Sequence, residues 1–517
     1  MTELLSNYLG GQWHTGTGGG TTLTDPVLGD ALVRVDATGL DLAAGFAFAR
    51  NRGGAALRAL TYKQRAAMLA QAVQVLNANR DAYYAIATAN SGTVKNDSAV
   101  DIDGGIFTLS TYAKLGDSLG ERNYLVDGEL TRLGKDPLFQ SQHVLVPNRG
   151  LALFINAFNF PSWGLWEKAA PALLAGVPVV VKPATTTAWL TQRMVKDVVD
   201  AGVFPAGALS VICGSSAGLM DALEPFDVVS FTGSAETAAV IRSHRAVVQH
   251  SVRTNVEADS LNSALLLPGE NAHSAAFDLL VKEVAREMTV KSGQKCTAIR
   301  RILVPQDLYH DAAQAIAARL AKTTVGNPRN EGVRMGALVN REQFNSVRQG
   351  LSVLRTEADV LHDGHSHALV DADPAIACCL GPTLLGVRAP DGAHRVHDTE
   401  VFGPVATLMP YRDTDHALQL IRRGQGSLVA SVYGSDPAAI ASVAVQLADS
   451  HGRVHCISPD VAALHTGHGN VMPQSLHGGP GRAGGGEELG GLRALSLYHR
   501  RAAIQASTAV LQPLRGD

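Results

Sequence analysis

The segment Ser292–Cys296 brings a glycine close to one of only five cysteines in the chain. A cysteine attacks as its thiolate. Because a free thiol has a pKa of about 8.5, we expect a nucleophilic Cys296 to need a partly exposed, positively polarised position. Gly293 allows the backbone to come close to a bound molecule. A lone cysteine is more often a small buried hydrophobic residue, so Cys296 alone leaves both interpretations open.

Short apolar runs, partly β-branched, alternate with amphipathic helical stretches in the first half of the chain. The runs are Leu151–Ile155, Val177–Val181, Leu209–Ile212 and Val228–Phe231. This alternation predicts parallel strands joined by crossover helices. Ligands of open parallel sheets bind beyond the carboxyl ends of the strands. The residues that follow the runs are Asn159, Lys182 with Thr185, and Gly233 with Ser234, and each can contact a nucleotide.

Composition and charge narrow the class of protein. A formal net charge of -3 provides no basic field for nucleic acid. The five cysteines are odd in number and lack paired spacing, which argues against a disulfide framework and against a zinc site. The start lacks a basic and apolar leader, and no apolar run approaches the roughly 20 residues of a membrane span. We expect a cytoplasmic protein that acts on small molecules, with no metal and no membrane partner.

Six short motifs stand in one order along nearly the whole chain. They are Gly10–Trp13, Asn159–Pro161, Val181–Ala184, Phe231–Ser234, Gly293–Cys296 and Glu400–Val405. In this order they resemble the aldehyde dehydrogenase superfamily. Taken singly, Asn159 is a candidate helix N-cap, Lys182 a solvated charge and Glu257 a surface carboxylate. Their joint order favours the functional interpretation of each.

The resemblance implies a covalent mechanism. Cys296 would attack an aldehyde carbon, and the side-chain amide of Asn159 would hold the resulting oxyanion. Glu257 would act as the general base that deprotonates the water for thioester hydrolysis.

The resemblance also implies a nicotinamide cofactor. Its predicted contacts are Phe158, Lys182, Thr185, Ser215, Gly233, Ser234, Glu400 and Phe402. Glu400 would hold the nicotinamide ribose, and Gly233-Ser234 would open a helix facing the pyrophosphate. Relatives selective for NAD often carry a glutamate at the position of Thr185, so the resemblance favours NADP.

Two departures indicate a particular branch of the superfamily. The segment Val256–Asn262 lacks the Gly-Gly pair that often follows the base, and Ala238 stands where a glycine is common. Both features are similar to a branch that oxidises CoA-linked semialdehydes in the aerobic breakdown of aromatic compounds. We expect oxidation of such an aldehyde to the free acid by a homodimer.

Three alternative functions remain open at this level. In an acylating dehydrogenase coenzyme A would replace water, but Glu257 argues against it. An inactive structural relative is disfavoured because Cys296, Asn159 and Glu257 are all present. A cysteine hydrolase is disfavoured because no strand-end histidine is evidently paired with Cys296.

The expected fold is α/β and aldehyde dehydrogenase-like, with two parallel-sheet lobes and a projecting β arm for oligomerisation. Residues 1–120 and 147–260 would form the dinucleotide-binding domain, and residues 261–472 the catalytic domain. Alternation of polar and apolar residues over 121–146 predicts a two-stranded arm, which joins the C-terminal segment 473–517 in oligomerisation.

Overall fold

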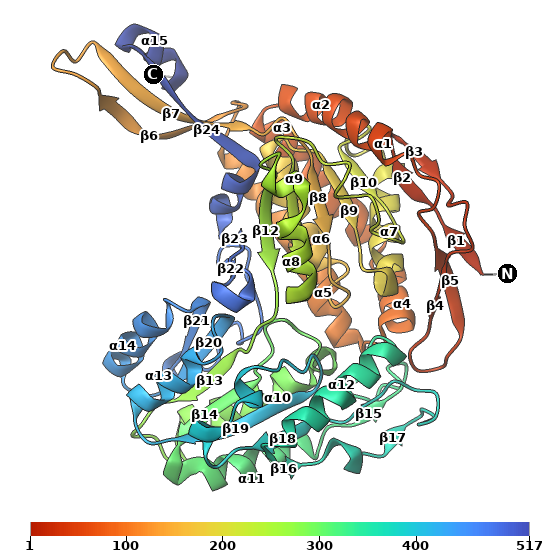
Figure 1. The fold of residues 1–517 in the computed structure, drawn as a ribbon, viewed down its shortest axis with the longest axis vertical. Coiled ribbons are helices and arrows are strands. Elements are labelled where there is room, and N and C mark those ends of the chain that lie inside the picture. The colour runs from red at the N-terminus through yellow and green to blue at the C-terminus, as the bar shows by residue number, and fades with distance from the viewer. Residues whose placement is uncertain (1, 516–517) are drawn as a thin grey trace.

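The computed structural model describes residues 2–515, and within them two seven-stranded sheets form separate lobes (Figure 1). The first sheet has the order β12-β11-β8-β9-β10-β2-β3. Its strands are β2 (Asn7–Leu9), β3 (Gln12–His14), β8 (Ala152–Ile155), β9 (Val179–Lys182), β10 (Leu209–Val211), β11 (Val228–Thr232) and β12 (Arg253–Glu257). The five strands from β8 to β12 are parallel, as the alternation of runs and helices predicts.

Helices cover both faces of this sheet. They are α1 (Leu42–Phe48), α2 (Gly54–Ala59), α3 (Tyr62–Ala78), α4 (Arg80–Ile86), α5 (Lys95–Ser118), α6 (Trp163–Ala175), α7 (Ala188–Asp200), α8 (Ala235–Ser243) and α9 (Arg245–Val248). The central helix α6 is buried over nearly its whole length and ends at Gly176, whose φ of 88° suits glycine. It begins at Trp163, so Asn159 is not its N-cap. The carboxylate of Asp101, on α5, instead accepts from the Ser162 and Trp163 amides.

The second sheet has the order β16-β18-β19-β14-β13-β20-β21. Its strands are β13 (Ser263–Leu266), β14 (Arg301–Pro305), β16 (Asp359–His362), β18 (Thr383–Gly386), β19 (Val405–Tyr411), β20 (Ser427–Tyr433) and β21 (His451–Ile457). The helices around it are α10 (Ala275–Thr289), α11 (Tyr309–Leu320), α12 (Arg341–Leu354), α13 (Thr414–Arg422) and α14 (Pro437–Leu447). The prediction of two parallel-sheet α/β lobes is confirmed.

Small sheets complete the chain. β1 (Glu3–Leu5) and β4 (Thr21–Thr24) flank β5 (Ala31–Val35) in a three-stranded sheet. β15 (Val325–Gly326) pairs with β17 (Leu369–Val370), and β22 (Leu476–Gly478) pairs with β23 (Glu487–Leu489). No helix within residues 2–515 has both the length and the apolar character needed to cross a bilayer.

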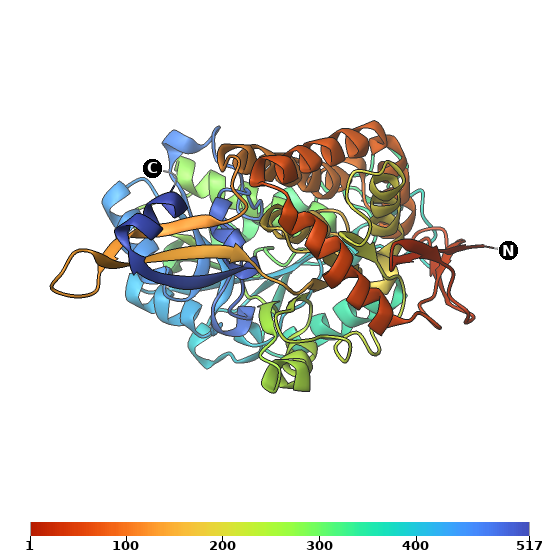
Figure 2. The same ribbon diagram turned by 90° about the horizontal axis from the view of Figure 1, so that it is seen from above.

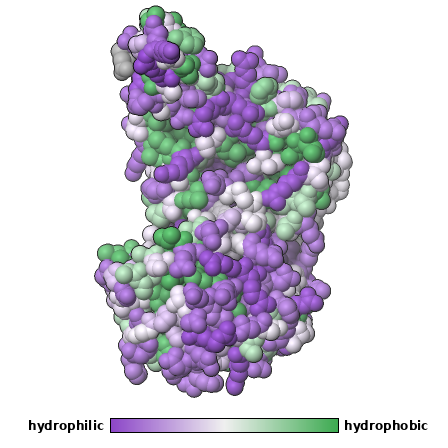
Figure 3. All heavy atoms as spheres, turned by 60° about the vertical axis from the view of Figure 1, so that its left-hand side comes forward, coloured by the Kyte–Doolittle hydropathy of each residue, from purple (hydrophilic) through white to green (hydrophobic). Residues whose placement is uncertain are grey.

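The arm projects from the first lobe (Figures 1 and 2). It contains β6 (Leu125–Arg132), β7 (Phe139–Pro147) and β24 (His499–Ser507), followed by α15 (Thr508–Arg515). The two-stranded prediction was incomplete, because β24 from the C-terminal segment pairs along the whole of β7. Leu138 and Phe139 are exposed here, and hydrophobic surface gathers beneath the arm and at the notch between the lobes (Figure 3).

The lobes meet where the chain passes from one sheet to the other. Strand β12 ends at Glu257 in the first sheet, and β13 begins at Ser263 in the second. The strand pair β22–β23 lies beside β21 and α6. Residues from both lobes and from the C-terminal segment therefore converge at the end of β12.

Candidate active site

The loop that carries Cys296 has an unusual backbone. Lys291 and Gly293 adopt left-handed φ values of 53° and 68° after the end of α10. A Cβ on Gly293 would lie 2.3 Å from the carbonyl oxygen of Gly403, so this position needs glycine. The Arg300 guanidinium donates to the carbonyls of Gly403 at 2.7 Å and Gly293 at 2.9 Å. These contacts tie the Cys296 loop to the Glu400–Val405 segment.

The three predicted catalytic residues lie together. Asn159, Glu257 and Cys296 line one small cavity of about 20 Å³ between the lobes. Asn159 and Glu257 are buried, whereas Cys296 is half-buried. The side-chain amide of Asn262 donates to the Cys296 carbonyl at 2.7 Å and so fixes the backbone of Cys296. Glu257 is therefore not a surface carboxylate, and the joint order of the motifs in the sequence corresponds to proximity in the fold.

His477 is a site residue that the sequence did not reveal. Its Nε2 lies 3.0 Å from Oε2 of Glu257, and donor atoms of His477, Glu257 and Cys296 all lie within 4.8 Å of one another. The indole of Trp163 packs edge-on against the imidazole, with ring centroids 5.3 Å apart. His477 pairs with Glu257 and not with Cys296, and β22 brings it to the site from 220 residues beyond Glu257.

A buried ionic network lies next to Glu257. Lys168, on α6, contacts Glu167 at 2.5 Å and Glu488 at 3.0 Å. Glu488, on β23, also accepts hydrogen bonds from Ser230 and Asn255. Helix α6 thus places a cation among carboxylates under the active site, and no motif in the sequence marks this network.

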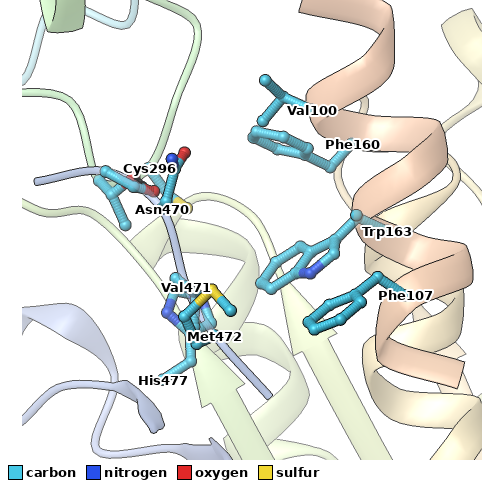
Figure 4. A pocket seen from close by; sticks show the side chains of 12 residues that line it. Val100, Phe107, Phe160, Trp163, Cys296, Asn470, Val471, Met472 and His477 are labelled. Carbon is cyan, nitrogen blue, oxygen red and sulfur yellow. Dashed lines mark hydrogen bonds between the residues drawn. The ribbon is translucent and has the colours of Figure 1, made fainter. Parts of the chain in front are cut away.

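An apolar cavity of about 210 Å³ leads to Cys296 (Figure 4). Trp163 and Phe160 line one side with Val100 and Phe107 of α5. Asn470, Val471, Met472 and His477 line the other side and come from the chain between β21 and the end of β22 (Figure 4). Cys296 forms the inner end, so a small apolar chain can reach the thiol.

The predicted nicotinamide side of the site lies across the Cys296 loop. Phe158 and Phe402 pack edge to face with centroids 5.7 Å apart, and the Arg300 guanidinium lies 5.6 Å from the Phe402 ring centroid. Oε2 of Glu400 accepts from the Ser260 amide at 3.1 Å. Its Oε1 is buried, and no group in the described part of the chain forms a hydrogen bond with it. A ribose hydroxyl would satisfy that oxygen.

The predicted adenosine side lies at the carboxyl ends of β9 and β10. Lys182 ends β9 and is buried, so it is not a solvated charge, and within residues 2–515 no carboxylate pairs with it. Thr185 donates to the Gly214 carbonyl at 3.1 Å, and the hydroxyl of the exposed Ser215 accepts from the Ala217 amide. A cation that pairs with no carboxylate of residues 2–515, together with two hydroxyls, fits an anionic group.

Helix α8 follows Gly233 and is capped by Ser234, whose hydroxyl accepts from the Thr237 amide at 3.3 Å. The Ala235 amide is also engaged, because it donates to the Asp259 carboxylate at 3.1 Å. Asp259 stands where the resemblance leads one to expect glycine. The predicted pyrophosphate site at this helix N-terminus is therefore partly filled by the chain's own acid.

Residues 13–498 match the aldehyde dehydrogenase family. The chain belongs to this family. It is an oxidoreductase that oxidises aldehydes, and the family uses NAD or NADP.

The relatives support this assignment. A 3,4-dehydroadipyl-CoA semialdehyde dehydrogenase from Aromatoleum evansii is 54% identical over 477 residues, covering 92% of this chain and 93% of the relative. A γ-glutamyl-γ-aminobutyraldehyde dehydrogenase from Burkholderia cenocepacia has a TM-score of 0.84 at 23% identity, covering 98% and 97% of the two chains. A betaine aldehyde dehydrogenase from Staphylococcus aureus in complex with NAD+ has a TM-score of 0.83 at 23% identity, covering 97% of each. The two structures confirm the predicted fold.

The ionisation of this aldehyde dehydrogenase departs from expectation at the thiol. Burial and the neighbouring Glu257, Glu167 and Glu400 raise the pKa of Cys296 well above that of a free thiol. The predicted positively polarised environment was wrong, since carboxylates surround the sulfur. Burial opposes the charge on Glu257, but His477 and Lys168 outweigh it and lower its pKa. The resting site thus pairs a protonated thiol with an ionised carboxylate.

The stability of this aldehyde dehydrogenase should depend on the ionisation of Glu400. Burial raises its pKa to about 7, against 4.5 in an unfolded chain. Between these values the folded state holds a proton that the unfolded state has released. Stability from this group is therefore complete below pH 4.5 and lost as the pH rises through 7. We expect wild type to lose about 3 kcal/mol relative to Glu400→Gln between pH 4.5 and 8.

Denaturant unfolding of both proteins at pH 4.5, 6 and 8 measures this difference. The glutamine retains an oxygen that can accept from the Ser260 amide, so the comparison isolates the charge. Parallel stability curves for the two proteins would contradict the assignment of a raised pKa to Glu400.

Proposed function

We propose that this enzyme oxidises a CoA-linked semialdehyde, 3,4-dehydroadipyl-CoA semialdehyde, to the free acid with NADP+. The observation that carries the proposal is the apolar cavity that ends at Cys296, with Glu257 and Asn159 at the same point. The identity of the substrate rests on the 54% identical relative of that name. The chemistry rests on the residues of this chain.

Cys296 is the proposed nucleophile, and Glu257 is placed to take the proton of its thiol. Attack on the aldehyde carbon would give a thiohemiacetal. Within residues 2–515 the Asn159 side chain makes no other hydrogen bond, so its amide is free to donate to the oxyanion. When bound, the nicotinamide dinucleotide supplies a hydride acceptor for this adduct. Glu400, Phe158 and Phe402 would hold its nicotinamide half.

Hydrolysis of the resulting thioester needs a water and a base. The cavity of about 20 Å³ shared by Asn159, Glu257 and Cys296 is just large enough for one water molecule. A water there would touch the carboxylate of Glu257, whose lowered pKa keeps it ionised at neutral pH. An ionised carboxylate has a free oxygen lone pair for the proton of that water. A built water site beside the thioester favours release of a free acid over transfer to coenzyme A.

The size of the cavity limits which part of the substrate can enter. About 210 Å³ is below the roughly 300–1,000 Å³ of pockets that enclose whole drug-sized ligands. A six-carbon unsaturated chain would fit between Trp163 and Val471, whereas the CoA moiety would remain outside. The apolar walls suit the hydrocarbon chain.

We assign NADP+ to the lobe of residues 1–120 and 147–260, which serves as the dinucleotide-binding domain. Lys182, Thr185 and Ser215 would bind the 2′-phosphate. Lys182 is buried and pairs with no carboxylate of residues 2–515, so its charge is available to the phosphate. Gly233 and Ser234 would face the pyrophosphate once Asp259 turns aside. Residues 261–472 would supply the catalytic domain.

Replacement of Thr185 by glutamate should reverse the cofactor preference. At roughly 4 Å, a carboxylate and a 2′-phosphate charge repel by about 1 kcal/mol in water and about 4 at an effective dielectric of 20. The ratio of kcat/KM with NADP+ to that with NAD+ should therefore fall about tenfold or more. Initial rates with each cofactor measure it. Thr185→Gln, which adds the bulk without the charge, is the matched control, and an equal loss in both variants would refute the electrostatic explanation.

Oligomeric state and cell compartment complete the proposal. Leu138 and Phe139 are exposed on the arm, and hydrophobic surface gathers beneath the arm (Figure 3). A second copy would cover this surface, so we infer a homodimer joined through residues 121–146 and 473–517.

The five cysteines are all free, which fits the reducing cytoplasm.

A substrate panel tests the proposed function. Free and CoA-linked aldehydes are each supplied with NAD+ or NADP+, and reduced nicotinamide is followed by absorbance. We expect the highest kcat/KM with the CoA-linked six-carbon semialdehyde and NADP+, with a free carboxylate as product. Faster turnover of free aldehydes, or consumption of added coenzyme A with formation of an acyl-CoA, would overturn the assignment.

A further inference from the structure

Three different donor types meet at the inner end of the apolar cavity. The sulfur of Cys296, a ring nitrogen of His477 and a carboxylate oxygen of Glu257 all lie within 4.8 Å of one another. They come from the loop after α10, from β22 and from the end of β12. Rigid elements thus hold the nitrogen and the oxygen, and the sulfur lies on a loop that Arg300 and Asn262 fix.

This combination of donors matches a particular class of ion. Borderline-soft Zn²⁺ takes sulfur, nitrogen and oxygen ligands in tetrahedral geometry, with bonds of about 2.0–2.3 Å. Such bonds put a nitrogen and an oxygen ligand roughly 3.3 Å apart. Nε2 of His477 and Oε2 of Glu257 are already 3.0 Å apart, and the Cys296 sulfur lies within 4.8 Å of both. The cysteine spacing in the sequence carries no signal for a site with one thiol.

A second observation points to a missing partner. Oε1 of Glu257 is buried and has no hydrogen-bond partner among residues 2–515. Buried carboxylate oxygens are normally satisfied, and a cation or a water at this position would satisfy this one. The imidazole of His477 is held in place by Trp163, with ring centroids 5.3 Å apart, and this fixes the direction of its nitrogen.

The site is accessible and its charge suits a cation. Cys296 and His477 both line the cavity of about 210 Å³, so an ion can enter and its fourth position can hold water (Figure 4). The nearby Lys168 ammonium opposes a cation, but Glu167 and Glu488 contact it at 2.5 and 3.0 Å. The carboxylates outnumber the ammonium around Glu257.

We propose that Cys296, Glu257 and His477 bind one Zn²⁺ ion, and that the bound ion reversibly inhibits the enzyme. Binding displaces two protons, one from the Cys296 thiol to solvent and one from Nε2 of His477, which donates to Glu257 in the metal-free site. The sulfur, that nitrogen and a Glu257 oxygen then bond to zinc. The nucleophile and the base are then both occupied, so neither attack nor hydrolysis can proceed. The inference rests on three donor atoms and is independent of which aldehyde or cofactor the enzyme uses.

Protection of the thiol in the unmodified enzyme tests the proposal without any variant. The protein is stripped with a chelator, incubated with or without Zn²⁺, and alkylated with iodoacetamide, and each cysteine peptide is quantified by mass. We expect Zn²⁺ to slow alkylation of Cys296 at least tenfold and to leave the exposed Cys456 unchanged. Equal alkylation of Cys296 with and without Zn²⁺ would refute the site.

Cobalt binding identifies the ligands. Co²⁺ added to the stripped enzyme should give one equivalent of a thiolate-to-cobalt charge-transfer band, and Zn²⁺ should displace it. Cys296→Ser should remove the band, and His477→Asn should weaken Co²⁺ binding at least tenfold. Cys456→Ser, next to His455, is the control and should keep the band. A band that survives in Cys296→Ser but not in Cys456→Ser would place the metal at that second thiol and refute the proposal.

Activity gives a separate readout. Micromolar Zn²⁺ should stop aldehyde oxidation, and excess chelator should restore it fully. Because protection and cobalt binding need no substrate, an error in the proposed substrate leaves both results intact. If Zn²⁺ does not slow alkylation of Cys296 and the enzyme still oxidises aldehydes normally, the metal site is refuted and the proposed function is unaffected.

Discussion

Replacing Cys296 with serine is expected to lower kcat for aldehyde oxidation roughly 10⁴-fold or more and to leave the Kd for NADP+ within about threefold. A serine hydroxyl is a much weaker nucleophile than a thiolate, and Glu257 alone does not ionise it at neutral pH. The proposed cofactor contacts, Lys182 and Thr185 among them, lie on the other side of the site and are unchanged.

Steady-state rates and NADP+ titration by intrinsic fluorescence measure the two quantities. Cys456→Ser is the matched control, because Cys456 is an exposed thiol outside the site and should tolerate the change. Retention of more than a tenth of wild-type turnover by Cys296→Ser would show that another group is the nucleophile.

Replacing Glu257 with glutamine is expected to give one burst of reduced cofactor per site, followed by turnover roughly 10²- to 10⁴-fold slower than wild type. The burst reports attack and oxidation, and the slow phase reports thioester hydrolysis without the base. Stopped-flow absorbance separates the two phases. Glu331→Gln, at an exposed carboxylate, is the control and should show wild-type kinetics.

The pH dependence of that burst distinguishes two roles of Glu257. After burial, the charge of Glu257 contributes most to the raised pKa of Cys296, so removing this charge should lower the thiol pKa. If Glu257 also takes the thiol proton, the burst in the variant should be slow at pH 7 and accelerate as the pH rises through the thiol pKa, where solvent replaces the base. A burst rate that is fast and independent of pH would restrict Glu257 to hydrolysis.

The fold was predictable wherever a local pattern decided it. The predicted strands Leu151–Ile155 and Val228–Phe231 match β8 and β11 because each is a continuous apolar run with clear ends. The need for glycine at position 293 follows from one steric requirement, because a Cβ there would lie 2.3 Å from the Gly403 carbonyl oxygen. By contrast, the third strand of the arm depends on pairing between β7 and β24, which are far apart in sequence.

The site was predictable only in part, for the same reason. Cys296, Glu257 and Asn159 stand in motifs, and the fold brings them to one cavity. His477 stands in a glycine-rich segment with no periodicity, so its contact with Glu257 could not be foreseen. Asp259 shows a limit of reasoning from motifs. The motif indicates that a glycine has been replaced, but it does not reveal that the Asp259 carboxylate accepts a hydrogen bond from the Ala235 amide at the start of α8.

The mass of the Cys296 peptide from Glu257→Gln enzyme, quenched after a single burst, tests the central claim most directly. The proposed mechanism predicts a gain equal to the aldehyde less two hydrogens, confined to Cys296 and released by hydroxylamine. This is the thioester left when attack and oxidation are complete but hydrolysis is blocked. An unmodified Cys296 after a full burst, or the same adduct on Cys213 or Cys456, would contradict it.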